Sequence, residues 1–536
     1  MTTTSAPRKL RSLCLLLACL TWHLQAHETI VRDTDPPGFN EPIPLYSSAL
    51  GSFTRPISTD NPQAQAYFDQ GFQMMFAFAK PEAARSFREA QRHDPDCAIC
   101  YWGEAWAWGS YLNGPMSAAD SPRAYAALQE ALARVDSASP LEADMIRAMI
   151  PRYVADFVPE RRMEQERAYA ASMEQLAEKY PDDLDIVTLY GDALFLLEER
   201  RGTRDLDDPD VIRLHGVLTS VLERDIQHPG ACHLYVHATE STANPGLAEA
   251  CAEFLGSSIP GASHINHMPS HTWNEIGRWN DSVRANLMAF HSDQKAAIGE
   301  GFAIYPMHNL AMLLYAASMD GQGAIAIQAG KDYEKLMNNS MYHVLTMIRF
   351  GRFDEVPAVT NRPTNSDVDG GMWDFAQGYA ALKLGDTQTA RDYLAQVKRL
   401  SQDTTDNFRF HDGGNLLAVV AGILEGEIHW SRGNMTAAIE AFEGANTAYD
   451  NIMYDEPEPL PFSAKHWLGA ALIEVGDFDR AIMLYEQDLR EHPHNGWALL
   501  GIKQALAAQG KSDPQIDARF QEAWARADTW ILGSKF

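Results

Sequence analysis

The chain has 536 residues, of which 46% are hydrophobic and 10% aromatic, values that exclude wholesale disorder. Its 44 basic and 72 acidic residues give a formal net charge of −28. A protein this acidic repels phosphate backbones and anionic lipid surfaces, which argues against nucleic acids and membrane surfaces as partners. After the N-terminal segment, no stretch approaches the roughly 20 apolar residues that a membrane span needs.

The first 26 residues have the pattern of a secretory signal peptide. A basic segment at residues 8–11 precedes a short apolar run at residues 13–20. The small residue Ala26 predicts cleavage near that position, so the mature protein is expected to be periplasmic or secreted. The alternative is a lipoprotein cleaved at Cys19, which leaves a shorter apolar run before the cut.

Four segments match the tetratricopeptide hairpin, in which small residues let two helices cross closely and a bulky residue packs from the second helix. The matching positions are Tyr67, Gly71, Ala83, Phe87, Ala90 and Pro95; Gly378, Gly385, Ala390 and Leu394; Gly426, Gly433, Ala438, Phe442 and Ala445; and Gly469, Gly476, Ala481, Tyr485 and Pro493. Stacked hairpins predict an all-α fold, a right-handed α-solenoid of tetratricopeptide-like repeats. Its concave face, lined by the first helix of each hairpin, would hold a ligand.

The predicted organisation is continuous, with no clean linker between separate domains. We expect a signal peptide at 1–26, an extended N-terminal arm at 27–60, and three groups of repeats at 61–200, 212–350 and 371–530. The segments 201–211 and 353–372 are rich in Pro, Gly, Asp and Thr and are predicted to be loops.

Seven of the 18 histidines fall in the central part of the chain. His233-Leu-Tyr-Val-His237 places two imidazoles on one face of a helix. His267-Met-Pro-Ser-His271 repeats this spacing 34 residues later, at the period of the repeat, and Pro269 predicts that it lies in the first turn of its helix. Neighbouring packed helices lie about 8–10 Å apart, so the four rings are expected to converge.

Two more histidines raise the candidate metal ligands to six: His264, one turn before His267, and His308, which opens the next repeat. A cluster of neutral imidazoles suits copper, which we favour, or zinc or iron. Six rings in two sets of three suit a paired-copper, oxygen-activating centre, and a mononuclear centre with three or four histidines is equally allowed. Glu240 is a candidate ligand or a hydrogen-bond partner of one.

The function that follows is an expectation with alternatives. A catalytic metal would bind oxygen or peroxide and oxidise a small organic molecule in the groove. The second hypothesis is a scaffold whose groove binds a peptide or protein partner, because clustered histidines also hydrogen-bond ligands or one another. The third is metal storage or delivery, with binding and no turnover. The sequence leaves open whether the protein is an enzyme, which substrate it takes and how many chains assemble.

Four cysteines remain after the predicted cleavage: Cys97, Cys100, Cys232 and Cys251. They allow two disulfides in an oxidising compartment, with the pairing left open. Cys97 and Cys100 are expected to be two small buried side chains of one helix.

The remaining motifs predict little chemistry. The chain has no nucleophile elbow, no phosphate-binding glycine loop and no His-Glu-x-x-His zinc-protease helix. His492 and His494 flank a proline that ends a helix, and both are expected to be solvated.

Several segments together resemble a large group of exported bacterial tetratricopeptide-repeat proteins over nearly the whole mature chain. These segments are residues 64–71, 94–103, His233–His237, His267–His271, Pro306–Asn309, Tyr454–Pro457 and Asn495–Leu499. The resemblance implies the repeat fold and the importance of the histidine segments, and it implies no particular reaction. Members of this group often have Asn-His where this chain has Ala79-Lys80, so a ligand of the usual site would be replaced here.

Overall fold

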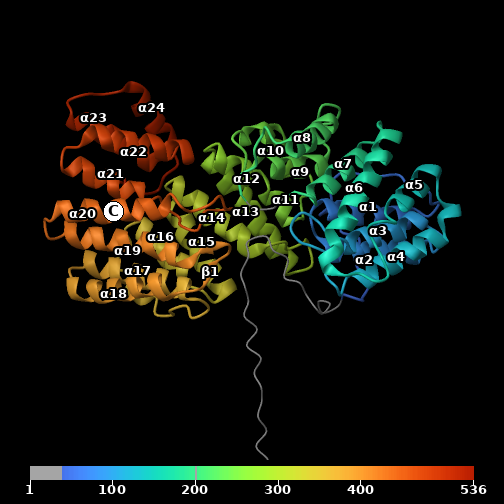
Figure 1. The fold of residues 1–536 in the computed structure, drawn as a ribbon, viewed down its shortest axis with the longest axis horizontal. Coiled ribbons are helices and arrows are strands. Elements are labelled where there is room, and N and C mark those ends of the chain that lie inside the picture. The colour runs from blue at the N-terminus through green and yellow to red at the C-terminus, as the bar shows by residue number, and fades with distance from the viewer. Residues whose placement is uncertain (1–38, 199–201) are drawn as a thin grey trace, which may run out of the picture.

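In a computed structural model, residues 39–198 and 202–536 are described, and they form stacked pairs of antiparallel helices (Figure 1). The predicted signal peptide and the first part of the arm lie outside these residues. The N-terminal helices are α1 (Pro62–Phe76), α2 (Lys80–His93), α3 (Ala98–Trp108), α4 (Ser121–Ala133), α5 (Pro140–Ala148), α6 (Arg162–Lys179), α7 (Leu184–Phe195) and α8 (Pro209–Leu222). Successive helices pack on one another along this part of the chain.

The central helices are shorter and more often interrupted. They are α9 (Pro229–Thr239), α10 (Glu249–Leu255), α11 (Ser263–His267), α12 (Pro269–Glu275), α13 (Trp279–Ala296), α14 (Pro306–Met319), α15 (Gly323–Met337) and α16 (Met341–Arg349). Short 3₁₀ turns lie at Val135–Ser137, Pro159–Arg161, Pro245–Ala248 and Val356–Ala358.

The C-terminal helices return to regular pairs. They are α17 (Asp367–Lys383), α18 (Thr387–Asp403), α19 (Gly413–Trp430), α20 (Met435–Tyr449), α21 (Lys465–Glu474), α22 (Phe478–Glu491), α23 (Gly496–Ala508) and α24 (Pro514–Ala523). A two-residue antiparallel pair, β1 (Asn407–Phe408) and β2 (His411–Asp412), joins α18 to α19. The loop predicted at 353–372 ends earlier than expected, because Ser366 caps the start of α17.

The repeat template explains how the hairpins pack. A Cβ atom on Gly71 of α1 would lie 2.7 Å from the ring of Phe87 on α2, and one on Gly426 of α19 would lie 2.3 Å from the ring of Phe442 on α20. Only a residue without a side chain lets these helices approach so closely. In the three C-terminal matches the second glycine lies in the turn between the two helices of the hairpin. These residues, Gly385, Gly433 and Gly476, have φ values of 92°, 74° and 82°, which glycine adopts readily. The predicted all-α repeat solenoid is therefore confirmed.

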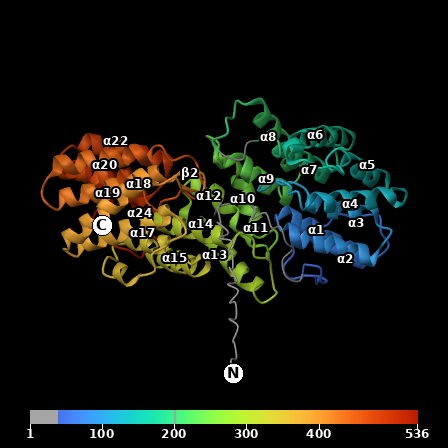
Figure 2. The ribbon, with the colours of Figure 1, turned by 60° about the horizontal axis from the view of Figure 1, so that its bottom comes forward.

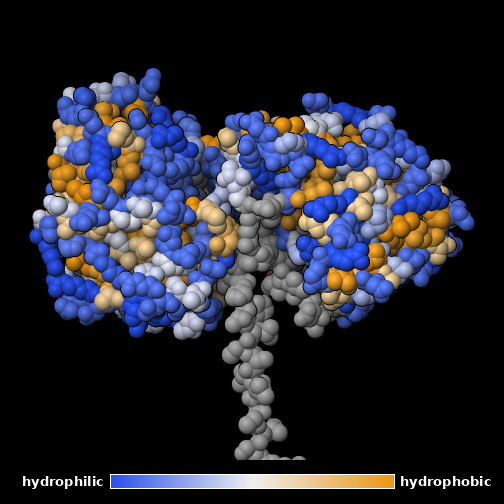
Figure 3. All heavy atoms as spheres, in the orientation of Figure 1, coloured by the Kyte–Doolittle hydropathy of each residue, from blue (hydrophilic) through white to orange (hydrophobic). Residues whose placement is uncertain are grey.

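The molecule has two lobes with a narrower centre, and a notch separates the lobes in the space-filling view (Figure 3). Buried apolar side chains form one main cluster up to residue 305 and a second one from residue 283 onward. Helices α9 to α14 lie between the lobes in both ribbon views (Figure 2). The histidine-rich helices thus occupy the junction of two hydrophobic cores, and the predicted three-part division of the repeats stays a prediction. Every helix that the structure describes is too short or too polar to cross a bilayer.

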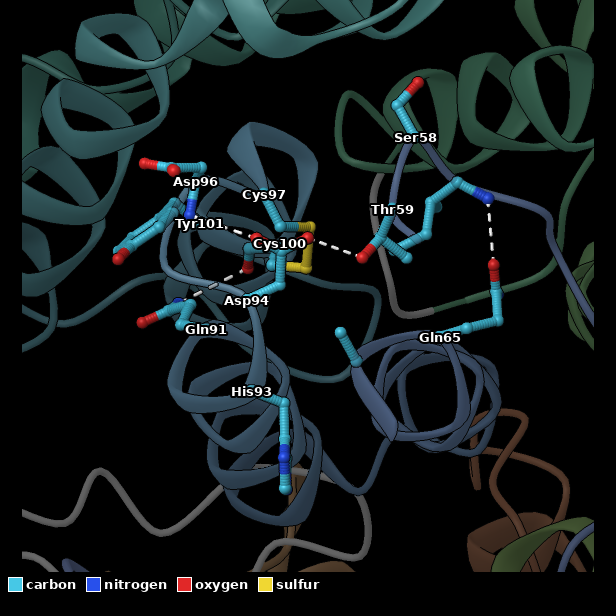
Figure 4. Close-up of a disulfide and its surroundings, with 12 residues drawn as sticks. Ser58, Thr59, Gln65, Gln91, His93, Asp94, Asp96, Cys97, Cys100 and Tyr101 are labelled. Atoms are coloured by element: carbon cyan, nitrogen blue, oxygen red, sulfur yellow. Dashed lines mark hydrogen bonds between the residues drawn. A yellow bond between two sulfur atoms is a disulfide. The ribbon is translucent and has the colours of Figure 1, made fainter. Parts of the chain in front are cut away.

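Two disulfides join the four cysteines of the described residues. Cys97 and Cys100 are bonded at the start of α3, next to the hydrogen bond between Thr59 and Asp94 (Figure 4). The expectation of two separate buried thiols in one helix is wrong, because Cys97 is the residue before the helix and can turn toward Cys100. The second disulfide joins Cys232 of α9 to Cys251 of α10.

Candidate metal centre

Helix α9 carries the first histidine pair into the interior. Pro229 occupies its first turn, and the backbone N–H of Ala231 donates to Nδ1 of His228, which caps the helix. Every residue of α9 is buried, so His233 and His237 face protein on all sides. As predicted, the two rings share one helix face, with centroids 5.0 Å apart.

The second pair spans a break between two short helices. His267 ends α11, and Pro269 starts α12, which carries His271. Pro269 therefore does lie in a first turn, but the motif bridges two helices instead of lying in one. His264 is on α11, and His308 follows Pro306 in the first turn of α14, as the sequence predicts.

The structure brings all six predicted histidines together as two groups of three. In each group the candidate ligand atoms lie within 4.8 Å of one another. One group is His233, His237 and His264, and the other is His267, His271 and His308. The groups touch, since the ring centroids of His237 and His271 are 5.4 Å apart and those of His264 and His267 are 5.7 Å apart.

Oxygen atoms lie within hydrogen-bond distance of Nδ1 in several of the imidazole rings. Nδ1 of His233 lies 2.5 Å from the carbonyl oxygen of Phe76, and Nδ1 of His267 lies 2.8 Å from Oδ1 of Asn286. The Asn286 amide donates from Nδ2 to the carbonyl of Ser282, which directs its oxygen toward His267. A carbonyl oxygen can only accept, so these rings carry their proton on Nδ1 and have a lone pair on Nε2.

The Nε2 lone pairs of His233 and His267 then face nitrogen atoms of neighbouring rings. Nε2 of His267 lies 2.7 Å from Nε2 of His271 and 3.1 Å from Nε2 of His308. Nε2 of His233 lies 3.2 Å from Nε2 of His264. Converging nitrogen lone pairs repel unless a proton or a metal ion lies between them. The donor set, all imidazole with oxygen partners behind the rings, fits a metal such as copper or zinc.

Glu240, the residue that follows α9, joins the two groups. Its carboxylate lies 3.0 Å from Nδ1 of His237 in one group and 2.8 Å from Nδ1 of His271 in the other. It is 1% exposed. The carboxylate accepts from Nδ1 of His237, and with His237 and His271 it forms a third group whose candidate ligand atoms lie within 4.8 Å of one another. Its predicted role, as a ligand or as a partner of one, stays a prediction.

Two strained aromatic residues close the centre on the N-terminal side. Phe78 has φ of 61° and Tyr305 has φ of 55°, a region that bulky residues avoid at a cost of about 1–3 kcal/mol. The Phe78 ring packs on His233, with centroids 4.3 Å apart, and the Tyr305 ring meets His264 edge-on at 5.0 Å. The Tyr305 hydroxyl lies 2.7 Å from that of Tyr111. The strained backbone places both rings against the histidines.

The centre is enclosed, whereas the sequence placed it in an open concave groove. All six histidines are at most 1% exposed. Burial lowers the pKa of His233 well below its usual value, because the charged ring loses its hydration and lies beside His237. A neutral imidazole is the form that binds a metal.

Sequence reasoning missed the residues that surround the rings. Glu456, in the loop before α21, lies 3.4 Å from Nδ1 of His271. Its segment, Tyr454 to Pro457, carried part of the family resemblance, which was the only signal available. The Lys80 ammonium lies over the Tyr111 ring, 4.6 Å from its centroid, and donates to the carbonyl of Gly109.

The expectation for His492 is wrong. It is 2% exposed, with Nδ1 3.2 Å from Asp488 and Nε2 2.9 Å from Glu458. Asp488 also lies 2.9 Å from Nε2 of His466. The loop that contains Glu458 covers this helix end, which no local pattern reveals. His494 is exposed as predicted, and His291 is exposed on α13, outside the centre.

A separate groove lies along the N-terminal repeats. The arm runs over α1 in an extended form, and side chains of α1 bind its backbone. Gln73 accepts from the N–H of Gly51, Asp69 from that of Arg55, and Gln65 from that of Ile57. A cavity of about 1010 Å³ lies beside the arm.

Neither a protein-family model nor a curated protein matches this sequence. Among solved structures, yeast Tom70 is 13% identical, with 86% of this chain and 99% of that chain covered and a TM-score of 0.32. The Cut9–Hcn1 hetero-tetramer of the APC/C is 14% identical, with 87% of this chain and 77% of that chain covered and a TM-score of 0.29. The TPR domain of P58(IPK) is 10% identical over 83% and 98%, with a TM-score of 0.20. At these values the assignment of the fold rests on the helix pairs themselves.

Proposed function

We propose that the six buried histidines bind a pair of metal ions, with copper favoured, and that the protein is an exported metal-dependent oxidoreductase acting on a small organic molecule. The observation that carries this proposal is the division into two groups of three rings, in which the Nε2 atoms of His271 and His308 converge on that of His267 and those of His233 and His264 lie 3.2 Å apart. Copper held by imidazoles supplies one-electron redox chemistry toward oxygen or peroxide.

The choice among metals follows from the donor set. Each group offers three imidazoles, while the buried carboxylate of Glu240 faces Nδ1 atoms, away from the converging Nε2 atoms. Non-haem iron sites of the common oxygenase type use two histidines and one carboxylate. Three histidines also suit zinc, which would support hydrolytic chemistry instead.

The chain itself performs three tasks in this proposal. The two hydrophobic cores keep bulk water from the rings, Glu240 orients one ring of each group, and Phe78 with Tyr305 limits access from the N-terminal lobe. Rings held in this way need little rearrangement when a metal binds, which raises affinity.

Elemental analysis followed by an oxygen-consumption assay tests the proposal. Protein loaded with copper and then dialysed should retain about two ions per chain, and the His237→Ala, His271→Ala double variant should retain none. The matched control is His291→Ala, which removes an exposed imidazole of the same region and should retain both ions. A wild type that retains no metal contradicts the proposal, and retention without oxygen consumption favours storage or delivery.

A second candidate function is a peptide-binding scaffold. The observation in its favour is the arm, an extended segment whose backbone is bound by polar side chains of α1 beside a large cavity. Extended peptides are recognised in this way through their main chain. A metal-free wild type that binds a peptide in trans, in competition with a synthetic peptide of residues 50–58, would support the scaffold.

A further inference from the structure

A small polar chamber lies directly behind His271, on the side of the C-terminal lobe. Its volume is about 60 Å³, enough for a group of a few water-sized atoms. His271 and Glu456 line it toward the candidate metal centre, and Glu491, whose side chain is 40% exposed, lines it toward the surface. The chamber therefore reaches from a residue of the centre to a partly exposed side chain.

The lining is acidic. Five of the lining residues carry a carboxyl group: Glu275, Asp455, Glu456, Glu458 and Glu491. Asp455 pairs with Arg409 and Glu491 with Lys465, and neither of these bases lines the chamber. His492 on the wall bonds to Glu458 and Asp488, and Glu456 lies 3.4 Å from Nδ1 of His271.

One buried polar side chain of the wall has an oxygen atom that accepts no hydrogen bond. Asn274 is 6% exposed, its Nδ2 donates to the sulfur of Met312 at 3.6 Å, and its Oδ1 has no hydrogen-bond partner. Buried polar atoms are nearly always satisfied in native proteins, so an unpartnered amide oxygen on this small chamber indicates a bound group.

Aromatic faces complete the wall. Trp279 and Tyr315 lie with ring centroids 6.1 Å apart, and Trp279 is fixed by donating from Nε1 to the carbonyl of Pro493 at 2.9 Å. Both rings line the chamber with Tyr454 and Met312. Aromatic faces beside carboxylates are the surroundings that bind organic ammonium ions.

We propose that this chamber binds the ammonium group of a small organic amine, with its alkyl part against Trp279 and Tyr315. The proposal deepens the proposed function, on which it rests for the role of the amine as substrate, but binding in the chamber needs no metal. Oδ1 of Asn274 accepts from the ammonium, and the carboxylates of Glu275 and Glu456 neutralise it. An inorganic cation would leave the aromatic and thioether surfaces of the wall without a function.

The charge balance of the wall supports this assignment. Burial, together with the neighbouring charges of Glu458 and Glu456, raises the pKa of Glu275 to about 8, although His492 opposes the shift. Three carboxyl groups in one chamber cannot all ionise cheaply without a counter-ion. A bound ammonium supplies that counter-ion.

Calorimetric titration of the metal-stripped full chain tests the proposal with n-propylammonium chloride as the probe. The matched probes are n-propanol, which has a similar shape and no charge, and potassium chloride, which has the charge and no alkyl part. Propylammonium should bind with one site per chain and the other two should not. Glu275→Gln should weaken binding about tenfold or more, because it removes a charge-assisted hydrogen bond.

The control variant is Glu486→Gln, which removes the same charge from the exposed face of α22. It should leave the affinity unchanged. The proposal is overturned if propylammonium does not bind, if propanol or potassium binds equally well, or if Glu275→Gln and Glu486→Gln bind alike. Metal retention by Glu275→Gln should stay at the wild-type value, so loss of the metal centre and loss of the amine site are separate results.

Discussion

Nε2 of His267 lies 2.7 Å from Nε2 of His271, although each ring has an oxygen acceptor at its Nδ1 atom. Asn286 leaves the lone pair of His267 on Nε2, so this atom needs a proton or a cation from its neighbours. Nε2 of His308 lies 3.1 Å from the same atom and completes a three-nitrogen site.

Glu240→Gln should weaken metal binding in both groups at once. The carboxylate is hydrogen-bonded to His237 and lies 2.8 Å from Nδ1 of His271, and loss of such an orienting partner typically costs roughly 10–100-fold in metal affinity. Competition with a chromophoric chelator measures the change. Glu223→Gln, an exposed glutamate just after α8, is the matched control, and equal affinities for the two variants would refute the orienting role of Glu240.

Asp293 should make the stability of the metal-free protein fall as pH rises toward 7. Burial raises the pKa of this carboxyl from 3.8 to about 7, although hydrogen bonds from Ser263 and Asn309 oppose the shift. Between those two values the folded protein holds a proton that the unfolded chain has released, so the free energy of unfolding decreases with increasing pH.

The measurement is urea unfolding of wild type and Asp293→Asn between pH 5 and pH 8. Asparagine keeps an oxygen acceptor for Nδ2 of Asn309, which lies 3.0 Å from the Asp293 carboxylate. The stability difference between variant and wild type should increase in favour of the variant as pH rises. A difference that is constant over this range would show that Asp293 is ionised throughout.

Gly426→Ala should destabilise the hairpin of α19 and α20 by about 1–3 kcal/mol, because the new methyl group would lie 2.3 Å from the Phe442 ring. The same hairpin provides the control. Gly444 of α20 has no atom within 4 Å of an added Cβ, so Gly444→Ala should stabilise by about 0.5–1 kcal/mol through helix propensity. Thermal unfolding of both variants checks the opposite signs, and destabilisation by both would contradict the packing described for Gly426.

Arg55→Ala should destabilise the protein and release the arm. The guanidinium is 7% exposed and lies 2.9 Å from Asp183 and 2.5 Å from Asp185 at the start of α7. Removing one member of a buried ion pair costs about 3–5 kcal/mol, because the other charge stays buried.

The exposed pair of Arg161 and Glu164 provides the control for this variant. Its side chains are 69% and 63% exposed, so Arg161→Ala should cost about 0–1 kcal/mol. Limited proteolysis should cut within residues 50–58 in Arg55→Ala alone. Equal resistance of both variants would show that the ion pair does not hold the arm.

The repeat period explains how much of the site was predictable. The 34-residue offset between the His233 and His267 motifs places them at equivalent points of adjacent hairpins, and their rings do converge. Phe78 and Glu456 are at least 155 residues away in sequence from the histidines that they contact. No local sequence pattern could therefore predict these contacts. The same reason underlies the error on His492, whose partner Glu458 lies in the loop before α21.

The burial of the six histidines could not be predicted from the repeat pattern either. Periodicity assigns residues to a helix face, but the two hydrophobic cores that cover α9, α11 and α14 depend on how far the whole array folds back on itself. The disulfide of Cys97 and Cys100 depends on the helix starting one residue later, at Ala98.

Anomalous-scattering crystallography of copper-loaded protein tests the metal centre most directly. Difference maps at the copper edge should show two peaks per chain, one among His233, His237 and His264 and one among His267, His271 and His308. A map with no peak among these rings, or with its peaks at exposed histidines such as His291 and His494, would contradict the account.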